Sequence, residues 1–215
     1  MTERPPTTDM AHQDPASAPD DGGRTHGLEL FRRLFERSPI GVAVVGPDGR
    51  PVAVNPALCE FLGRDADELE AMEFAEFTHP EDVDADVEQY GRLMAGEIQD
   101  YSLDKRFVTA GGEVVWGRLA VTAIRDPEGE VRRAVAFVRD VTEQRRAREA
   151  LRRSERRYRS LFESSRDAVY LTTADGEIVD INRAGREMFG YEADELVGRD
   201  ARELYADPED RERFL

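Results

Sequence analysis

Hydrophobic and polar residues along this chain follow an order that predicts helices and strands in succession. Apolar positions at helical spacing within residues 28–35 precede two short β-rich runs, 41–45 and 51–54, on either side of an Asp48-Gly49 turn. Glycine supplies the positive φ that a tight turn needs, so the two runs predict a β-hairpin. Asn55 follows the second run directly and suits the N-cap of a helix.

The same order returns 127 residues later. Residues 161–196 align with residues 34–69 without a gap, and 16 of the 36 positions are identical. The offset is far longer than the roughly 20–50 residues of a solenoid repeat, so it indicates a duplicated domain. Asn182 takes the position of Asn55, and we expect both to be structural caps instead of ligand contacts.

A long helix and three strands follow in the first copy. Pro80 suits the first helical position, Thr78 or His79 suits the N-cap, and apolar residues then recur at helical spacing. Three stretches in which apolar and polar residues alternate come next, 101–110, 113–125 and 131–141. The short polar loops between them favour adjacent antiparallel strands. The pattern therefore predicts an α+β fold, a five-stranded antiparallel sheet with its helices on one face.

Three further segments complete the organisation. Residues 1–26 contain four prolines and no periodic apolar pattern, and we expect a disordered tail. Residues 143–160 are rich in arginine and predict a helical linker, either a solvated connection or a dimerising signal helix. Its coiled-coil-like seam has spacings of four and three (Ala147, Leu151, Ser154, Tyr158, Leu161). Residues 161–215 repeat only the first half of the pattern, so we expect an incomplete second domain.

Composition narrows the classes of function. With 30 basic and 46 acidic residues the net charge is −16, which argues against binding to nucleic acid or an anionic membrane. No apolar run approaches the ~18 residues of a membrane span, and no signal peptide is recognisable, so we expect a cytoplasmic protein. The single cysteine, Cys59, excludes an intramolecular disulfide and a multi-cysteine metal site. Lys105 is the only lysine and the only candidate for lysine chemistry.

The order of these elements, with Thr-His-Pro-Glu-Asp at 78–82 before the long helix, resembles a PAS domain. The segments 112–116 and 137–142 resemble the C-terminal half of that fold, and Asp140-Val141-Thr142-Glu143 is similar to the family's Asp-Ile-Thr signal-transfer motif. The resemblance covers residues 27–142 completely and residues 158–215 for the first half of the fold only. It implies a sensory role in bacterial signalling, with Asp140 and Thr142 joining the last strand to the outgoing helix.

Members of this family sense light, gas, redox state or small molecules, so the site has to decide among them. A flavin photoreceptor of the family needs a cysteine in an Asn-Cys-Arg-Phe context, and Cys59 lies earlier, as a core residue would. A haem sensor usually places a histidine on the long helix, and residues 81–95 contain none. We expect neither cofactor and no metal. The carboxylates near the start of this helix are expected to form a solvated face (Glu81, Asp82, Asp84, Asp86, Glu88).

A candidate ligand pocket can be placed between the helices and the sheet. Its wall would be formed by large apolar side chains from both layers (Phe61, Phe77, Val87, Tyr90, Met94, Trp116, Phe137). The plainer interpretation is that these side chains fill the core. A mostly apolar cavity would suit a small hydrophobic or aromatic ligand.

Together these observations predict a cytosolic sensory module without catalysis of its own. It would respond to a small molecule or a partner, relay the change through the 143–160 helix and form a homodimer through residues 141–160. We find no Gly-rich phosphate loop, no histidine-kinase phosphoacceptor box and no cyclase motif in these residues. Two alternatives stay open. The chain is the input part of a histidine kinase, or of a cyclic-di-GMP synthase or phosphodiesterase, whose catalytic part lies beyond Leu215; or it is purely a dimerisation module.

Overall fold

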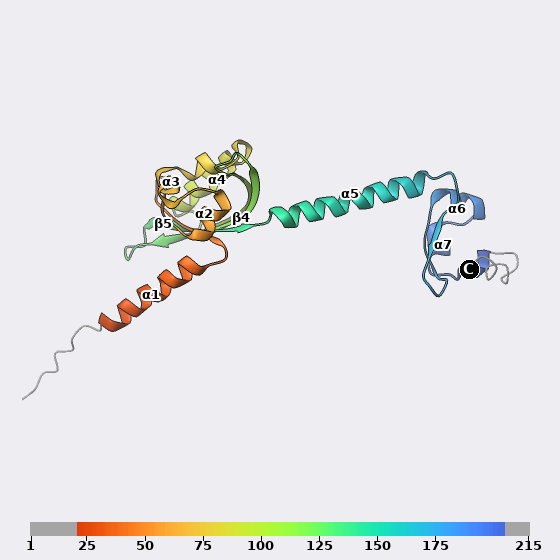
Figure 1. The fold of residues 1–215 in the computed structure, drawn as a ribbon, viewed down its shortest axis with the longest axis horizontal. Coiled ribbons are helices and arrows are strands. Elements are labelled where there is room, and N and C mark those ends of the chain that lie inside the picture. The colour runs from red at the N-terminus through yellow and green to blue at the C-terminus, as the bar shows by residue number, and fades with distance from the viewer. Residues whose placement is uncertain (1–20, 205–215) are drawn as a thin grey trace, which may run out of the picture. The chain divides into compact units, whose positions relative to one another are not determined.

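A computed structural model describes residues 21–204 of the chain. It divides into two compact units, which meet in the sequence between Val141 and Thr142. The elements of the first unit, labelled in Figure 1 where there is room, are α1 Asp21–Arg37, β1 Gly41–Val45, β2 Pro51–Val54, α2 Pro56–Leu62, α3 Ala66–Ala71, the 3-10 helix η1 Phe74–Phe77, α4 Pro80–Met94, β3 Asp100–Val108, β4 Val114–Arg125 and β5 Val131–Asp140.

The five strands of the first unit form one antiparallel sheet in the order β2-β1-β5-β4-β3. The hairpin strands β1 and β2 have the bounds that the sequence predicts, and β1 pairs with β5 so that Gly41 lies opposite Val138. Helix α2 contacts β1, α3 contacts β2, and α4 contacts β3, β4 and β5. The predicted α+β fold is therefore confirmed, with α2, α3 and α4 gathered against the sheet (Figure 1).

The core of the first unit lies between this sheet and these helices. Alternation in the strands directs every second side chain inward, as Ala134, Ala136 and Val138 of β5 are buried. Gly117 of β4 is needed for close approach, because a Cβ at this position would collide with the ring of Phe107 on β3.

The second unit begins with a long helix and continues with a small sheet. Its elements are α5 Thr142–Ser164, β6 Tyr170–Thr172, β7 Ile178–Ile181, α6 Arg183–Phe189, α7 Ala193–Leu196 and the 3-10 helix η2 Ala201–Leu204. Strands β6 and β7 pair antiparallel, and a small core forms over them from Ile178, Ile181, Leu196 and Ala201. The described part of this unit thus contains the hairpin and first helices of the repeat.

Two sequence-based boundaries need correction. Helix α1 begins at Asp21, so residues 21–26 are helical and not part of a disordered tail; residues 1–20 lie outside the described residues. The apolar spacing from Leu28 onward continues through this helix to its end at Arg37. Helix α5 runs to Ser164, four residues beyond the predicted linker, because Leu161 and Phe162 continue its pattern.

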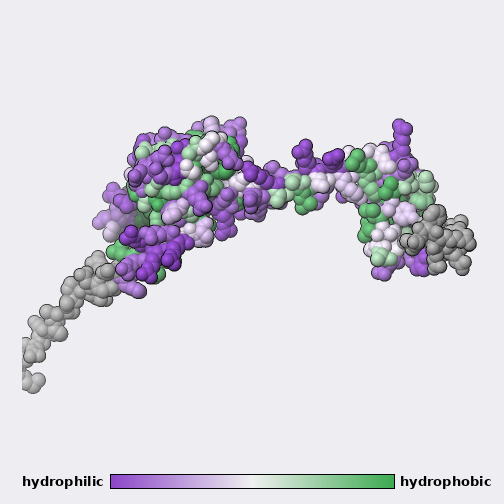
Figure 2. Space-filling model, in the orientation of Figure 1, coloured by the Kyte–Doolittle hydropathy of each residue, from purple (hydrophilic) through white to green (hydrophobic). Residues whose placement is uncertain are grey.

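The described helices are not suited to cross a bilayer. None of them combines sufficient length with sufficient apolar character to do so. Helix α5, the longest of those described, carries eight arginines, and hydrophilic residues predominate over its surface in Figure 2, with hydrophobic positions between them.

Candidate functional site

A cavity of about 40 Å³ lies in the core of the first unit. That volume exceeds the 10–15 Å³ needed by one ordered water and allows a guest of only a few non-hydrogen atoms. The wall comes from the sheet, α2, η1 and α4 (Ala43, Val45, Pro51, Leu58, Phe74, Phe77, Asp86, Tyr90, Tyr101, Lys105, Phe107, Leu119, Val121, Ala136, Val138).

A buried ion pair interrupts the apolar wall. The ammonium of Lys105 donates hydrogen bonds to Oδ2 of Asp86 at 2.5 Å and to Oγ1 of Thr78 at 2.6 Å. The other carboxylate oxygen of Asp86 accepts a hydrogen bond from the Tyr101 hydroxyl at 3.0 Å. The side chains of Lys105 and Asp86 are only 2% and 1% exposed. We call these four residues the Lys105 cluster.

The periodicities of α4 and β3 place Asp86 and Lys105 on the buried faces of these two elements. Helix α4 buries Asp86, Tyr90 and Leu93, whose spacings of four and three residues define one face of the helix. On β3, Lys105 and Phe107 are the inward residues of the alternating strand. The ammonium also lies 4.4 Å from the centroid of the Phe107 ring, a cation–π contact.

Burial dominates the electrostatics of this site. Loss of water around the ammonium lowers the pKa of Lys105, although the Asp86 carboxylate opposes that shift. Burial also raises the pKa of Tyr101 and that of Tyr90, and the negative charge of Asp86 adds to both shifts. The Tyr90 hydroxyl donates to the carbonyl of Gly46 at 2.6 Å. Charges this deeply buried are tolerated because each has a partner.

The structure separates the residues predicted to line the pocket. Phe77 and Tyr90 do line the cavity. Phe61 packs edge-on against Phe107, and Met94 packs against the core, but neither is part of the wall.

Three of the predicted pocket residues lie elsewhere. Val87 is 46% exposed and Phe137 is 39% exposed. Val87 follows Asp86 and so points off the buried face of α4, while Phe137 alternates with the inward Ala136 and Val138 of β5. Trp116 lies opposite Arg106 in the register of β3 and β4, and the guanidinium sits 5.6 Å from its ring centroid.

The run of carboxylates on α4 is not the uniformly solvated face that we predicted. Asp86 is buried in the cavity wall. Asp82 accepts hydrogen bonds from the side chain and the backbone of Arg106, and these lower the pKa of Asp82. The sequence does contain a signal for the burial of Asp86, because Asp86 lies four residues before Tyr90 and so on the same face of the helix. Lys105, the only lysine, likewise lies in a strand whose residues alternate between the two faces.

The predicted cap residues are the N-caps of their helices. The ring Nδ1 of His79 accepts a hydrogen bond from the backbone N–H of Glu81 at the start of α4. The side-chain oxygen of Asn55 accepts from the N–H groups of Val42 and Leu58, and its amide donates to the carbonyls of Phe35 and Ile40.

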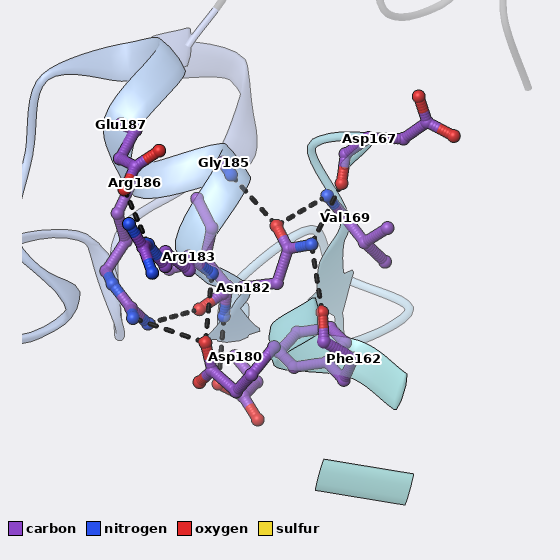
Figure 3. Close-up of polar contacts among 11 residues, drawn as sticks. Phe162, Asp167, Val169, Asp180, Asn182, Arg183, Gly185, Arg186 and Glu187 are labelled. Atoms are coloured by element: carbon purple, nitrogen blue, oxygen red, sulfur yellow. Dashed lines mark hydrogen bonds and ion pairs between the residues drawn. The ribbon is translucent and has the colours of Figure 1, made fainter. Parts of the chain in front are cut away.

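The second unit repeats the Asn55 arrangement at an offset of 127 residues. The side-chain oxygen of Asn182 accepts from the N–H groups of Val169 and Gly185, and its amide donates to the carbonyls of Phe162 and Asp167, as Figure 3 shows. Both asparagines are fully buried. Each ties the helix before the hairpin to both hairpin strands and to the next helix, which is a structural role.

The residues predicted for signal transfer lie at the end of the sheet. Asp140 is the last residue of β5 and pairs with Gly117 of β4, while Thr142 is the first residue of α5 and is buried. Between them, the N–H of Val141 donates to the carbonyl of Trp116 at 2.9 Å. The start of α5 therefore continues directly from a strand that is fixed to β4.

The wall fits neither haem nor a flavin that bonds to cysteine. Its lining residues include no histidine and no cysteine, and the cavity volume is far below that of either group. Cys59 is partly buried and packs against the core, and burial raises the pKa of its thiol. Among the described residues we also find no cluster of three or more side chains suited to hold a metal ion.

Two segments of the chain match models of one family. Residues 35–146 match a model described as the PAS fold, and residues 156–215 match a second model with the same description. The first match alone covers just over half of the chain. The chain belongs to the PAS family. It thus contains one PAS domain with its full sheet and a second match that begins within α5.

The similar curated proteins are much longer than this chain. A probable diguanylate cyclase of Escherichia coli K12, DgcE, is 40% identical over 116 residues, which are 54% of this chain and 10% of that protein. The two-component sensor PprA of Pseudomonas aeruginosa is 30% identical over 174 residues, 79% of this chain and 18% of that protein. This chain therefore spans between about a tenth and a fifth of the length of these curated relatives.

Solved structures agree on the fold. The PAS domain of a protein from Colwellia psychrerythraea superposes with a TM-score of 0.50 at 14% identity, covering 54% of this chain and 98% of that one. At this identity the likeness shows the fold alone.

Proposed function

We propose that this chain is a cytosolic sensory module whose first PAS domain responds to a small molecule in its core cavity. The observation that carries the proposal is the Lys105 cluster, of which Lys105, Asp86 and Tyr101 line the cavity. An apolar core of this size needs no ion pair for its packing, and burying two charges costs several kcal/mol before they attract each other. Perturbed ionisable groups beside a cavity are typical of functional sites.

The change would leave the PAS domain through β4 and β5. Leu119 and Val121 of β4 line the cavity, and the Trp116 carbonyl of the same strand accepts a hydrogen bond from Val141, the residue before α5. A guest that moves the wall would also move this junction, where Asp140 and Thr142 lie. Packed helices switch between discrete arrangements, so α5 is a suitable carrier of a rotation or register change.

Helix α5 also supports dimerisation. Leu151, Tyr158 and Leu161 of the predicted seam are 60%, 47% and 63% exposed. Large apolar side chains at coiled-coil spacing on a helix are stabilised when a second helix covers them. The partner in this proposal is a second copy of the chain, which gives a parallel pair of α5 helices between two sensory domains.

The output would come from other domains of a longer protein. DgcE is a probable diguanylate cyclase and PprA a two-component sensor, and each is several times longer than this chain. The proposal is that these residues form the input part of a sensor kinase or of a cyclic-di-GMP enzyme. The open reading frame beyond Leu215 tests this directly, because a kinase or cyclase motif there supports it and a stop codon contradicts it.

The cavity is tested by filling it. Ala136→Leu places three more carbon atoms in the wall, and Ala85→Leu adds the same atoms to the exposed face of α4 as a matched control. Native mass spectrometry and thermal unfolding would be measured with neutral molecules of about two to six non-hydrogen atoms. We expect a raised unfolding temperature in the wild type and in Ala85→Leu, and none in Ala136→Leu. No shift for any molecule in the wild type, with no retained ligand, would leave an assembly module as the function.

A further inference from the structure

We propose that Lys105 captures a small aldehyde as a Schiff base, with Asp86 as the counter-ion of the product. This inference rests on the proposed function, because it assigns a chemical class to the guest of the same cavity. It makes Lys105 a modification site in the wall of the first PAS domain. The argument comes from the neutrality of the site, its size and the chemistry of the amine.

The amine is positioned to react with a guest. Lys105 lines the cavity, and two of its three N–H groups are held by Thr78 and Asp86. The ring centroids of Phe107 and Phe74 lie 4.4 Å and 5.5 Å from the ammonium nitrogen. As the chain has no other lysine, the only other primary amine is that of the N-terminus.

The charge of the site favours a neutral guest. The ammonium and the carboxylate cancel, and Tyr101 and Thr78 complete their hydrogen bonds. A permanently charged ligand would lose its hydration here without gaining an unpaired counter-charge. A neutral carbonyl compound avoids that cost and still reacts with an amine. The cavity of about 40 Å³ limits it to a few carbon atoms.

The condensation can run within the existing cluster. A proton passes from the Lys105 ammonium to Asp86, and the free amine attacks the carbonyl carbon while the oxygen takes up a proton. The carbinolamine hydroxyl is protonated and leaves as water, and the nitrogen lone pair forms the C=N bond. In balance, the aldehyde and the ammonium give an iminium and one water, and no oxidant or reductant is needed.

The surroundings favour each stage of this sequence. Burial lowers the pKa of Lys105 and so increases the share of free amine, the nucleophilic form. Asp86 is within hydrogen-bond distance of the nitrogen, as a proton acceptor and donor must be. The iminium product carries the same single positive charge as the ammonium, so the ion pair with Asp86 is kept.

Reductive trapping of the full chain tests the proposal. The protein would be incubated with propanal and cyanoborohydride, and labelled sites located by peptide mass spectrometry, with the N-terminal amine as internal reference. We expect faster labelling of Lys105 in the folded protein than in the urea-unfolded chain, because the cavity holds the aldehyde beside an amine whose pKa burial lowers. Pyridoxal phosphate, which is too large for the cavity, should label the N-terminus and leave Lys105 untouched.

Two variants of α4 distinguish an acid–base role of Asp86 from a general effect of substitutions on this helix. Asp86→Asn also removes the charge that raises the pKa of Lys105, so the two proteins are compared at a pH at which the amine is free in both. There Asp86→Asn should slow the labelling of Lys105 about 100-fold, because the neighbouring proton acceptor and donor is lost. Asp84→Asn, on the exposed face of the same helix, should leave it unchanged. If Asp86→Asn does not fold, the comparison of the two aldehydes on the wild type still decides the question.

Lys105 that stays unlabelled by propanal in the folded protein, yet is labelled after unfolding, would overturn the proposal and leave the ion pair with a structural role only. A different result would contradict the proposed function. A thermal shift by a non-carbonyl molecule that Ala136→Leu abolishes would preserve sensing even in that case.

Discussion

Removing both members of the Lys105–Asp86 pair should destabilise the first PAS domain by less than the summed cost of removing each one alone. Lys105→Met leaves the Asp86 carboxylate, 1% exposed, without its counter-charge, and Asp86→Asn leaves the ammonium in the same position. Breaking a buried pair on one side costs about 3–5 kcal/mol, because the remaining charge is desolvated and unpaired. The double variant leaves no such charge, so it should be destabilised by less than the sum, with a coupling free energy of about 2–3 kcal/mol.

Urea unfolding followed by tryptophan fluorescence measures this cycle. Trp116 is the only tryptophan and lies on β4, so the signal reports the first unit. The exposed pair Arg92–Glu97 is the control, and Arg92→Met or Glu97→Gln should cost less than about 1 kcal/mol. A cost for Lys105→Met as small as that of the control, or strictly additive single variants, would refute the argument that this pair is a desolvated unit.

Three further predictions follow from buried contacts and from the exposed seam. In the folded protein the pKa values of Tyr90 and Tyr101 lie above the ordinary 10.0. Their contribution to stability is therefore full below pH ~10 and is lost as the pH rises beyond it. Exchanging both tyrosines for phenylalanine should make the unfolding free energy fall less steeply above that pH. Asn55→Ala removes four side-chain hydrogen bonds, one of them the cap of α2, and should cost at least about 2 kcal/mol in urea unfolding; a loss below about 0.5 kcal/mol would contradict the assigned role. Leu151→Asp with Tyr158→Asp places charges on the α5 seam and should convert a dimer to monomer in sedimentation velocity, whereas an unchanged mass in solution would remove the proposed dimer.

Much of the fold is predictable because its signals are local. Residues close together in the chain determine the bounds of β1 and β2. The same holds for the caps at Asn55, Asn182 and His79. A turn glycine or a capping side chain acts on the backbone within a few positions, whatever the rest of the molecule does. The start of α1 is where this fails, since no local signal in residues 21–26 outweighed their polar composition.

The lining of the cavity depends on tertiary structure. Which face of α4 is buried is decided by how the helix lies on the sheet, and a rotation by one position exchanges Val87 for Asp86. On β5, one step of register exchanges Phe137 for Ala136. Hydrophobicity alone selects Val87 and Phe137 for the interior, yet both are exposed.

From the sequence alone one can derive the order of strands and helices and their caps, because each follows from contacts between near neighbours. The position of the only lysine can also be read there, but its burial cannot. A charge enters the core only when a partner at the right distance offsets its lost hydration, and the partner of Lys105 lies nineteen residues away on another element. Only the packing of α4 against β3 brings the two together, and that packing turned a helix face predicted to be solvated into the wall of the site.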